Sequence, residues 1–108
     1  MATNNKKFVF PKYITIVGVK YDIKLEEDEQ NHATVECEKK IIRVNPSLND
    51  ADKISYLIHE IVHAAFYECC LANALFHGKN EKEKEDLEEV FAEFIHRIVW
   101  PSIRSIIK

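Results

Sequence analysis

The residues in this chain best suited to chemistry are His59, Glu60 and His63, which form the pattern H-E-x-x-H within LIHEIVHAAF. Residues four apart lie one turn above another on the same face of a helix, so both imidazoles can bind one metal ion. Zn²⁺ suits such a site because it accepts imidazole and carboxylate ligands and leaves a tetrahedral position open. Glu60 lies roughly 100° around the helix from His59 and can act as general base towards a water that the metal acidifies.

The residues around the motif favour a helix. Apolar positions recur there with a helical period: Ile54, Leu57, Ile58, Ile61, Val62 and Phe66. The alternative interpretation is that His59 and His63 are two half-buried histidines on a packed helix. Because the motif and its helical context agree, we favour a zinc site.

A zinc site of this kind needs a third protein ligand. Many carboxylates are available, and so are three further histidines: His32, His77 and His96. Further along the chain a helical apolar stripe defines the face expected to turn inward: Leu87, Val90, Phe91, Phe94, Ile95 and Ile98. Glu88 falls on the edge of that face, whereas Glu89, Glu93 and His96 fall on the solvent side. A carboxylate beside an apolar stripe is costly unless it is paired or bound to a metal, so the pattern favours Glu88, with Glu89 as second choice.

The elements that must position these residues are strands followed by helices, which predicts an α+β fold in one domain over residues 1–108. We expect a flexible N-terminal segment over residues 1–11. Residues 12–45 alternate apolar and polar side chains, which predicts a small antiparallel meander of three or four strands with a tight hairpin at Gly18. The segment IIRVN, residues 41–45, is expected to be an edge strand beside the metal site, where an extended peptide can add as another strand.

Two long helices are expected after the strands. The first should run from Ala51 to Phe76 or His77, with Gly78 as its stop. The second should begin with a capping box formed by Asn80 and Glu83. Pro101 should then end or kink this helix.

Composition narrows the class of protein. The net charge is −3 and no basic patch stands out, so we expect no nucleic-acid partner. No apolar run reaches the roughly 18 residues of a membrane span, and the N-terminal residues lack the apolar core of a secretory signal. Three cysteines, two of them adjacent, do not suggest a disulfide framework. These features predict a cytoplasmic protein that does not bind membranes.

The stretches LIHEIVHAAF and EEVFAEFIHRIVWP together resemble the ImmA/IrrE-type zinc metallopeptidases, a gluzincin-like family found in phages, mobile elements and bacteria. The family pattern is H-E-x-x-H on one helix, then a glutamate on the next helix that opens an apolar run ending near a proline. The resemblance implies that His59, His63 and Glu88 hold zinc and that Glu60 is the catalytic acid and base. It further implies a short member of phage or prophage type.

The sequence therefore predicts a zinc metallopeptidase that hydrolyses a peptide or protein substrate, such as a regulatory protein. Three side chains are candidates for stabilising the oxyanion, and the sequence does not choose among them: Tyr67, His96 and Arg97. The alternative function is a catalytically inactive binding or regulatory module of phage or mobile-element origin, in which zinc contributes folding energy alone.

Overall fold

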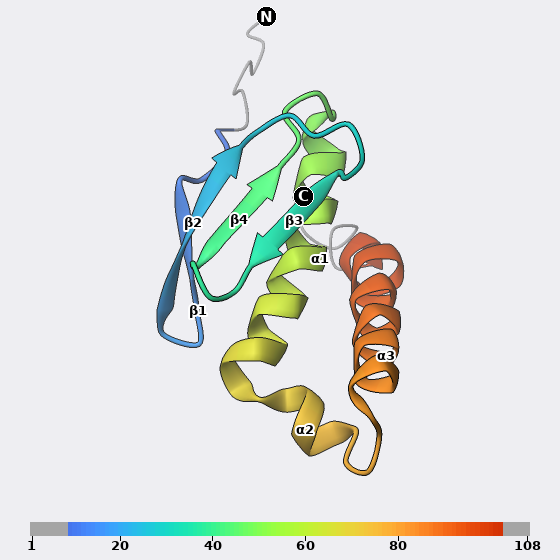
Figure 1. Ribbon diagram of the computed structural model, residues 1–108. Coiled ribbons are helices and arrows are strands. Elements are labelled where there is room, and N and C mark those ends of the chain that lie inside the picture. Colours follow the sequence, from blue (N-terminus) through green and yellow to red (C-terminus); the bar gives the residue numbers. More distant parts are fainter. Residues whose placement is uncertain (1–8, 103–108) are drawn as a thin grey trace, which may run out of the picture.

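Strands precede helices along the chain in the computed structural model of the protein, which describes residues 9–102. Four strands form one sheet in the N-terminal part, and helices form the rest (Figure 1). The predicted α+β fold class is therefore confirmed. Of the segment expected to be flexible, residues 1–8 lie outside the described residues, and Phe10 packs against the hydrophobic core.

The first two strands form the predicted hairpin. β1 (Tyr13–Ile16) and β2 (Val19–Leu25) pair antiparallel, with Ile16 opposite Val19. The two-residue turn between them has positive φ at both positions, 51° at Val17 and 77° at Gly18. Positive φ at both positions is the property of a type I′ turn, whose twist matches that of the flanking strands.

The other two strands depart from the predicted meander. β3 (Ala33–Glu36) and β4 (Ile41–Val44) form an antiparallel hairpin, but β4 also pairs parallel with β2, so the strand order is β1-β2-β4-β3. The prediction that residues 41–45 form an edge strand is therefore wrong, and β3 takes that place. The physical reason is burial: Ile42 and Val44 are fully buried, which suits a central strand, whereas every residue of β3 is only half-buried, which suits an edge.

The helix that carries the H-E-x-x-H residues, α1 (Asp50–Cys69), ends before the predicted stop at Gly78. Cys70 adopts the left-handed conformation, and its backbone N–H donates to carbonyls of the last turn. A short helix, α2 (Leu71–Leu75), follows. This bend brings Phe76 back onto the ring of Phe66, with 6.1 Å between ring centroids.

The second long helix begins as predicted. At the start of α3 (Glu81–Phe94), Asn80 and Glu83 form the capping box, since each side chain accepts a hydrogen bond from the other residue's backbone N–H. The helix then widens into a π-helical segment, η1 (Ile95–Val99), and helical structure extends past Pro101. Proline lacks an N–H and crowds the preceding turn, and the wider π turn accommodates this irregularity.

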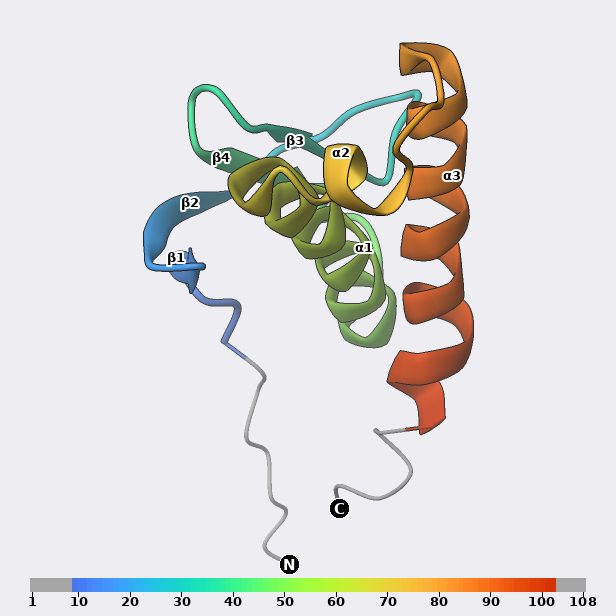
Figure 2. The ribbon, with the colours of Figure 1, turned by 90° about the horizontal axis from the view of Figure 1, so that it is seen from below.

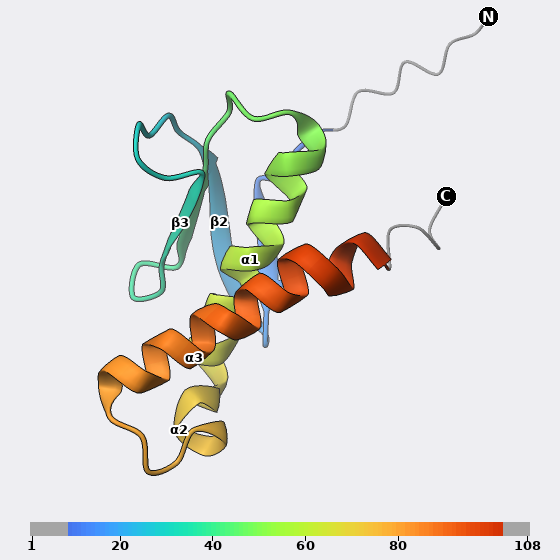
Figure 3. The same cartoon turned by 90° about the vertical axis from the view of Figure 1, so that its right-hand side faces the viewer.

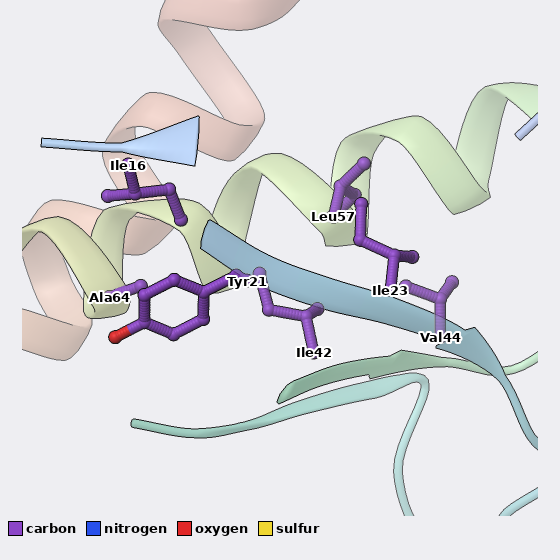
Figure 4. Packing of buried hydrophobic residues seen from close by; sticks show 7 residues of the cluster. All are labelled: Ile16, Tyr21, Ile23, Ile42, Val44, Leu57 and Ala64. Carbon is purple, nitrogen blue, oxygen red and sulfur yellow. The ribbon is translucent and has the colours of Figure 1, made fainter. Parts of the chain in front are cut away.

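α1 is the central element of the molecule. The sheet lies on one side of it and α3 on another, as the two rotated views show (Figures 2 and 3). Seven side chains from β1, β2, β4 and α1 form the core between the sheet and α1 (Figure 4): Ile16, Tyr21, Ile23, Ile42, Val44, Leu57 and Ala64. This packing fixes α1 against the sheet and leaves another face of α1 for α3. Within residues 9–102, no helix has the length and apolar character needed to cross a membrane.

Candidate metal centre

Two histidines on successive turns of α1 point their Nε2 atoms towards one another. The Nε2 atoms of His59 and His63 are 3.3 Å apart, and the ring centroids are 5.0 Å apart. His59 is buried and His63 is half-buried. The helical spacing in the sequence therefore brings the two imidazoles together, as predicted.

A carboxylate from α3 completes this group. Glu89 Oε1 lies 2.8 Å from Nε2 of His59, and Glu89 Oε2 lies 3.1 Å from Nε2 of His63. The three residues offer ligand atoms that all lie within 4.8 Å of one another. Two imidazoles and one carboxylate are a ligand set that zinc prefers in a catalytic site.

The distance between the two nitrogens fits zinc. A tetrahedral ion with Zn–N bonds of about 2.0–2.1 Å keeps two nitrogen ligands roughly 3.3 Å apart, and the observed separation is 3.3 Å. The Glu89 side chain is 53% exposed, so the group is open towards solvent on the side of this carboxylate. An open side is what a catalytic zinc site needs for water and substrate.

Glu88, the predicted third ligand, lies on the other side of the His63 ring. Its Oε1 atom is 2.7 Å from Nδ1 of His63, the ring nitrogen that points away from His59. A carboxylate on Nδ1 keeps the proton there and leaves Nε2 with its lone pair free for a metal. The predicted ligand Glu88 therefore lies against the far side of the His63 ring, where it could orient that imidazole, whereas Glu89 lies against both Nε2 atoms.

A third carboxylate of α3, that of Glu93, lies beside the ring of His59. Its Oε2 atom is 3.9 Å from Nδ1 of His59 and 3.7 Å from Nδ1 of His96. His59, Glu93 and His96 form a second group that could hold an ion. However, Arg97 Nε already donates to the same Glu93 oxygen at 3.0 Å, and a guanidinium there opposes a second metal ion. Both Nδ1 atoms are buried without a hydrogen-bond partner among the described residues. His96 therefore contacts His59 through the edge-on packing of their rings, 5.4 Å apart between centroids.

The burial of His96 overturns its predicted position on the solvent side of the helix. His96 is 8% exposed and stands edge-on to His59, whereas Val90, Phe94 and Ile98 are each more than half exposed. Ala92 is the one buried residue of α3. Only part of the predicted apolar stripe therefore faces α1, because Phe91 packs on Phe66 whereas Val90, Phe94 and Ile98 do not become buried. The physical reason is that polar contacts to the two imidazoles, rather than apolar burial, set the rotation of α3.

Glu60 is the buried carboxylate of the group. Burial raises the pKa of Glu60 to about 7, and nearby Glu89 adds to the rise while His63 opposes it. Glu60 lines the same cavity as His59, His63 and Glu89. A carboxyl group with a pKa near neutrality can both accept and return a proton, which is the property required of a general acid and base.

The cavity over this group has a volume of about 430 Å³. Tyr56 and His32 line it, and their rings lie 4.6 Å apart between centroids. The sequence raised His32 only as one of three available histidines and did not raise Tyr56, although Tyr56 lies one helical turn before Glu60 and could have been found by that spacing. Of the three suggested oxyanion donors, Tyr67 lines a different cavity and Arg97 is held by Glu93, whereas His96 lies against the ring of His59.

We expect Glu60→Gln to stabilise the metal-free protein at pH 8. A carboxyl group with a pKa above its unfolded value favours folding while protonated, and this advantage is lost as pH rises from about 4.5 to about 7. A neutral amide avoids that loss, so the gain should be roughly 3 kcal/mol at pH 8 and close to zero at pH 4.5. Urea unfolding at both pH values measures the gain. Equal stability of the two proteins at pH 8 would contradict the burial of Glu60.

We also expect Glu89→Ala to weaken zinc binding more than Glu88→Ala does. Loss of a ligand should cost well over 100-fold in affinity, whereas loss of an orienting carboxylate typically costs about 10–100-fold. Competition with a chromophoric chelator measures both constants, with Glu85→Ala as control because Glu85 is an exposed glutamate of the same helix. If Glu88→Ala proves the more damaging change, the original assignment of Glu88 is restored.

Comparisons of the chain with protein-family models, with curated proteins and with solved structures find no match. An assignment of function therefore rests on the residues and the geometry of this site.

Proposed function

We propose that the protein is a zinc-dependent metallopeptidase, with zinc held by His59, His63 and Glu89. The observation that carries the proposal is the convergence of Glu89 on both Nε2 atoms, at 2.8 and 3.1 Å, beside the buried Glu60. A zinc ion bound there would supply a Lewis acid that polarises a carbonyl group and acidifies water. The H-E-x-x-H spacing on one helix supports the same assignment.

Different residues of the chain would transfer the proton and orient the zinc ligands during hydrolysis. Glu60 takes a proton from the attacking water, whose oxygen forms a bond to the carbonyl carbon of the peptide. Glu60 then gives that proton to the amine nitrogen as the C–N bond breaks, so the products are a carboxylic acid and an amine. Glu88 keeps the ring of His63 oriented throughout, because its carboxylate lies 2.7 Å from Nδ1, and His96 packs edge-on against the ring of His59.

We also propose that the chain is a relative of the ImmA/IrrE-type metallopeptidases. The H-E-x-x-H helix and the glutamate-led helix that follows support this, with Glu89 in place of Glu88 as third ligand. A phage or mobile-element setting follows from the same resemblance. A cytoplasmic location agrees with the three free cysteines, of which Cys69 and Cys70 are exposed.

One observation favours the alternative, a zinc-stabilised binding module without catalysis. Val90, Phe94 and Ile98 form an exposed apolar stripe on α3 and η1, and such stripes commonly contact other proteins. In that case zinc would fix α3 against α1, and Glu60 would be dispensable.

Glu60→Gln should distinguish the two functions. Glutamine has nearly the same shape but cannot accept the proton, so peptide hydrolysis should fall by about 10²–10⁴-fold or more while zinc content stays the same. The measurement is cleavage of a peptide library by zinc-loaded protein, with metal content determined on the same sample. His63→Ala, which removes a ligand, is the control that should lose zinc and activity together.

A Glu60→Gln protein with full biological activity and full zinc content would contradict the peptidase proposal. It would support the binding module, provided that His63→Ala abolishes the same activity.

A further inference from the structure

The outer face of α3 and η1 carries a row of apolar side chains that are open to solvent. Val90, Phe94 and Ile98 are 65%, 52% and 55% exposed. Leu87, which is half-buried, and Pro101, which is exposed, extend the row at its two ends. These five residues are called the outer row below. A folded domain rarely exposes large apolar side chains in one continuous line unless they contact another molecule.

The outer row lies on the side of α3 that faces away from α1. Ala92 marks the face that packs on α1, because it is the buried residue of α3. At 100° per residue, Val90 and Phe94 each lie about 160° around the helix from Ala92. Figure 3 agrees with this, since α3 crosses the outside of the molecule with α1 behind it. A molecule bound to the outer row would therefore not come between α1 and α3, where the metal centre lies.

The spacing of the outer row is symmetrical about Phe94. Val90 and Ile98 lie four residues before and after it, and Leu87 and Pro101 lie seven residues before and after it. These steps average about 3.5 residues, which is the period of helices that pack side by side along their length. A row with the same spacing in both directions can pack on a second copy of itself about a two-fold axis. Phe94 would then meet Phe94 of the second copy, and Val90 would meet Ile98.

The order of charges along the chain favours an antiparallel pair. Residues 81–89 hold six carboxylate side chains and two lysines, whereas residues 95–108 hold no aspartate or glutamate and three basic side chains: Arg97, Arg104 and Lys108. In an antiparallel pair the acidic half of each helix lies beside the half of its partner that leads into these basic residues. A parallel pair would set six carboxylates beside six carboxylates, which opposes association.

We propose that the protein forms a homodimer in which the outer rows of two copies pack antiparallel, with Phe94 at the two-fold axis. The occupant is a second copy of the chain because the outer row is complementary to itself, both in the spacing of its apolar side chains and in the order of its charges. The inference goes beyond the proposed function and does not depend on it, since the outer row shares no residue with the metal centre.

Size-exclusion chromatography with light scattering, over a range of protein concentrations, measures the mass in solution. The unsubstituted chain should show twice the 12.6 kDa of one copy. Phe94→Glu sets two carboxylates face to face at the axis, so it should weaken the dimer by at least about 100-fold. Tyr13→Glu is the matched control and should leave the dimer intact, because Tyr13 lies on β1 and is similarly exposed, at 56%. Circular dichroism confirms that both variants are folded.

Disulfide cross-linking tests the orientation of the two helices, in a folded background whose three native cysteines are replaced by serine. With oxidised glutathione as the oxidant, Phe94→Cys should link to itself, because the two thiols meet at the axis. Val90→Cys and Ile98→Cys should each stay unlinked alone and should link to one another when the two proteins are mixed.

A mass of one copy at every concentration would overturn the inference and leave the outer row for a partner of another kind. A dimer that Phe94→Glu leaves unchanged would overturn it as well, since the contact would then lie elsewhere on the molecule. Self-linking of Val90→Cys and of Ile98→Cys, without links between the two, would show a parallel pair and reject the proposed arrangement.

Discussion

The contact between α1 and α3 depends on imidazole–carboxylate pairs at its centre. Glu88, Glu89 and Glu93 bring three carboxylates against His59 and His63, while Ala92 is the one buried residue that α3 contributes. Three carboxylates at one interface repel one another unless positive charge lies between them. A divalent cation, or protonated histidines, can supply that charge. The positive charge that allows α3 to pack against α1 is therefore the same charge that a metal ion at this group would supply.

This constraint explains why Val90 and Phe94 of α3 are exposed. Rotating the helix to bury Val90 and Phe94 against α1 would carry the carboxylates away from the two imidazoles. The π-helical segment at Ile95–Val99 then brings His96 in against His59, as π-bulges at functional sites often do. Aromatic packing of Phe91 on Phe66 and Phe76 anchors the other end of the interface. Local polar geometry thus outweighs the burial of an apolar stripe in this part of the chain.

The sequence predicts the first helix of the site well because the spacing of His59 and His63 is a local property of one helix. The strand positions and the capping box of Asn80 and Glu83 are equally local, and both agree with the structure. The strand order is not a local property, because alternation shows which face of a strand is buried but not which strands are its neighbours. For that reason the central position of β4 was not predicted. The rotation of α3 was not predicted for a similar reason. Its apolar residues were assumed to face the core, and this assumption favoured Glu88 over Glu89 as the third ligand.

X-ray absorption at the zinc edge of protein loaded with one equivalent of zinc tests the central claim most directly. The site described above requires two imidazole nitrogens and oxygen ligands at about 2.0–2.1 Å, with no sulfur. The scattering pattern of two imidazoles should persist in Glu88→Ala and in His96→Ala. A Zn–S distance of about 2.3 Å, which would bring in Cys37 or Cys70, would contradict the account. So would a third imidazole that disappears in His96→Ala, because His96 would then be a ligand in place of Glu89.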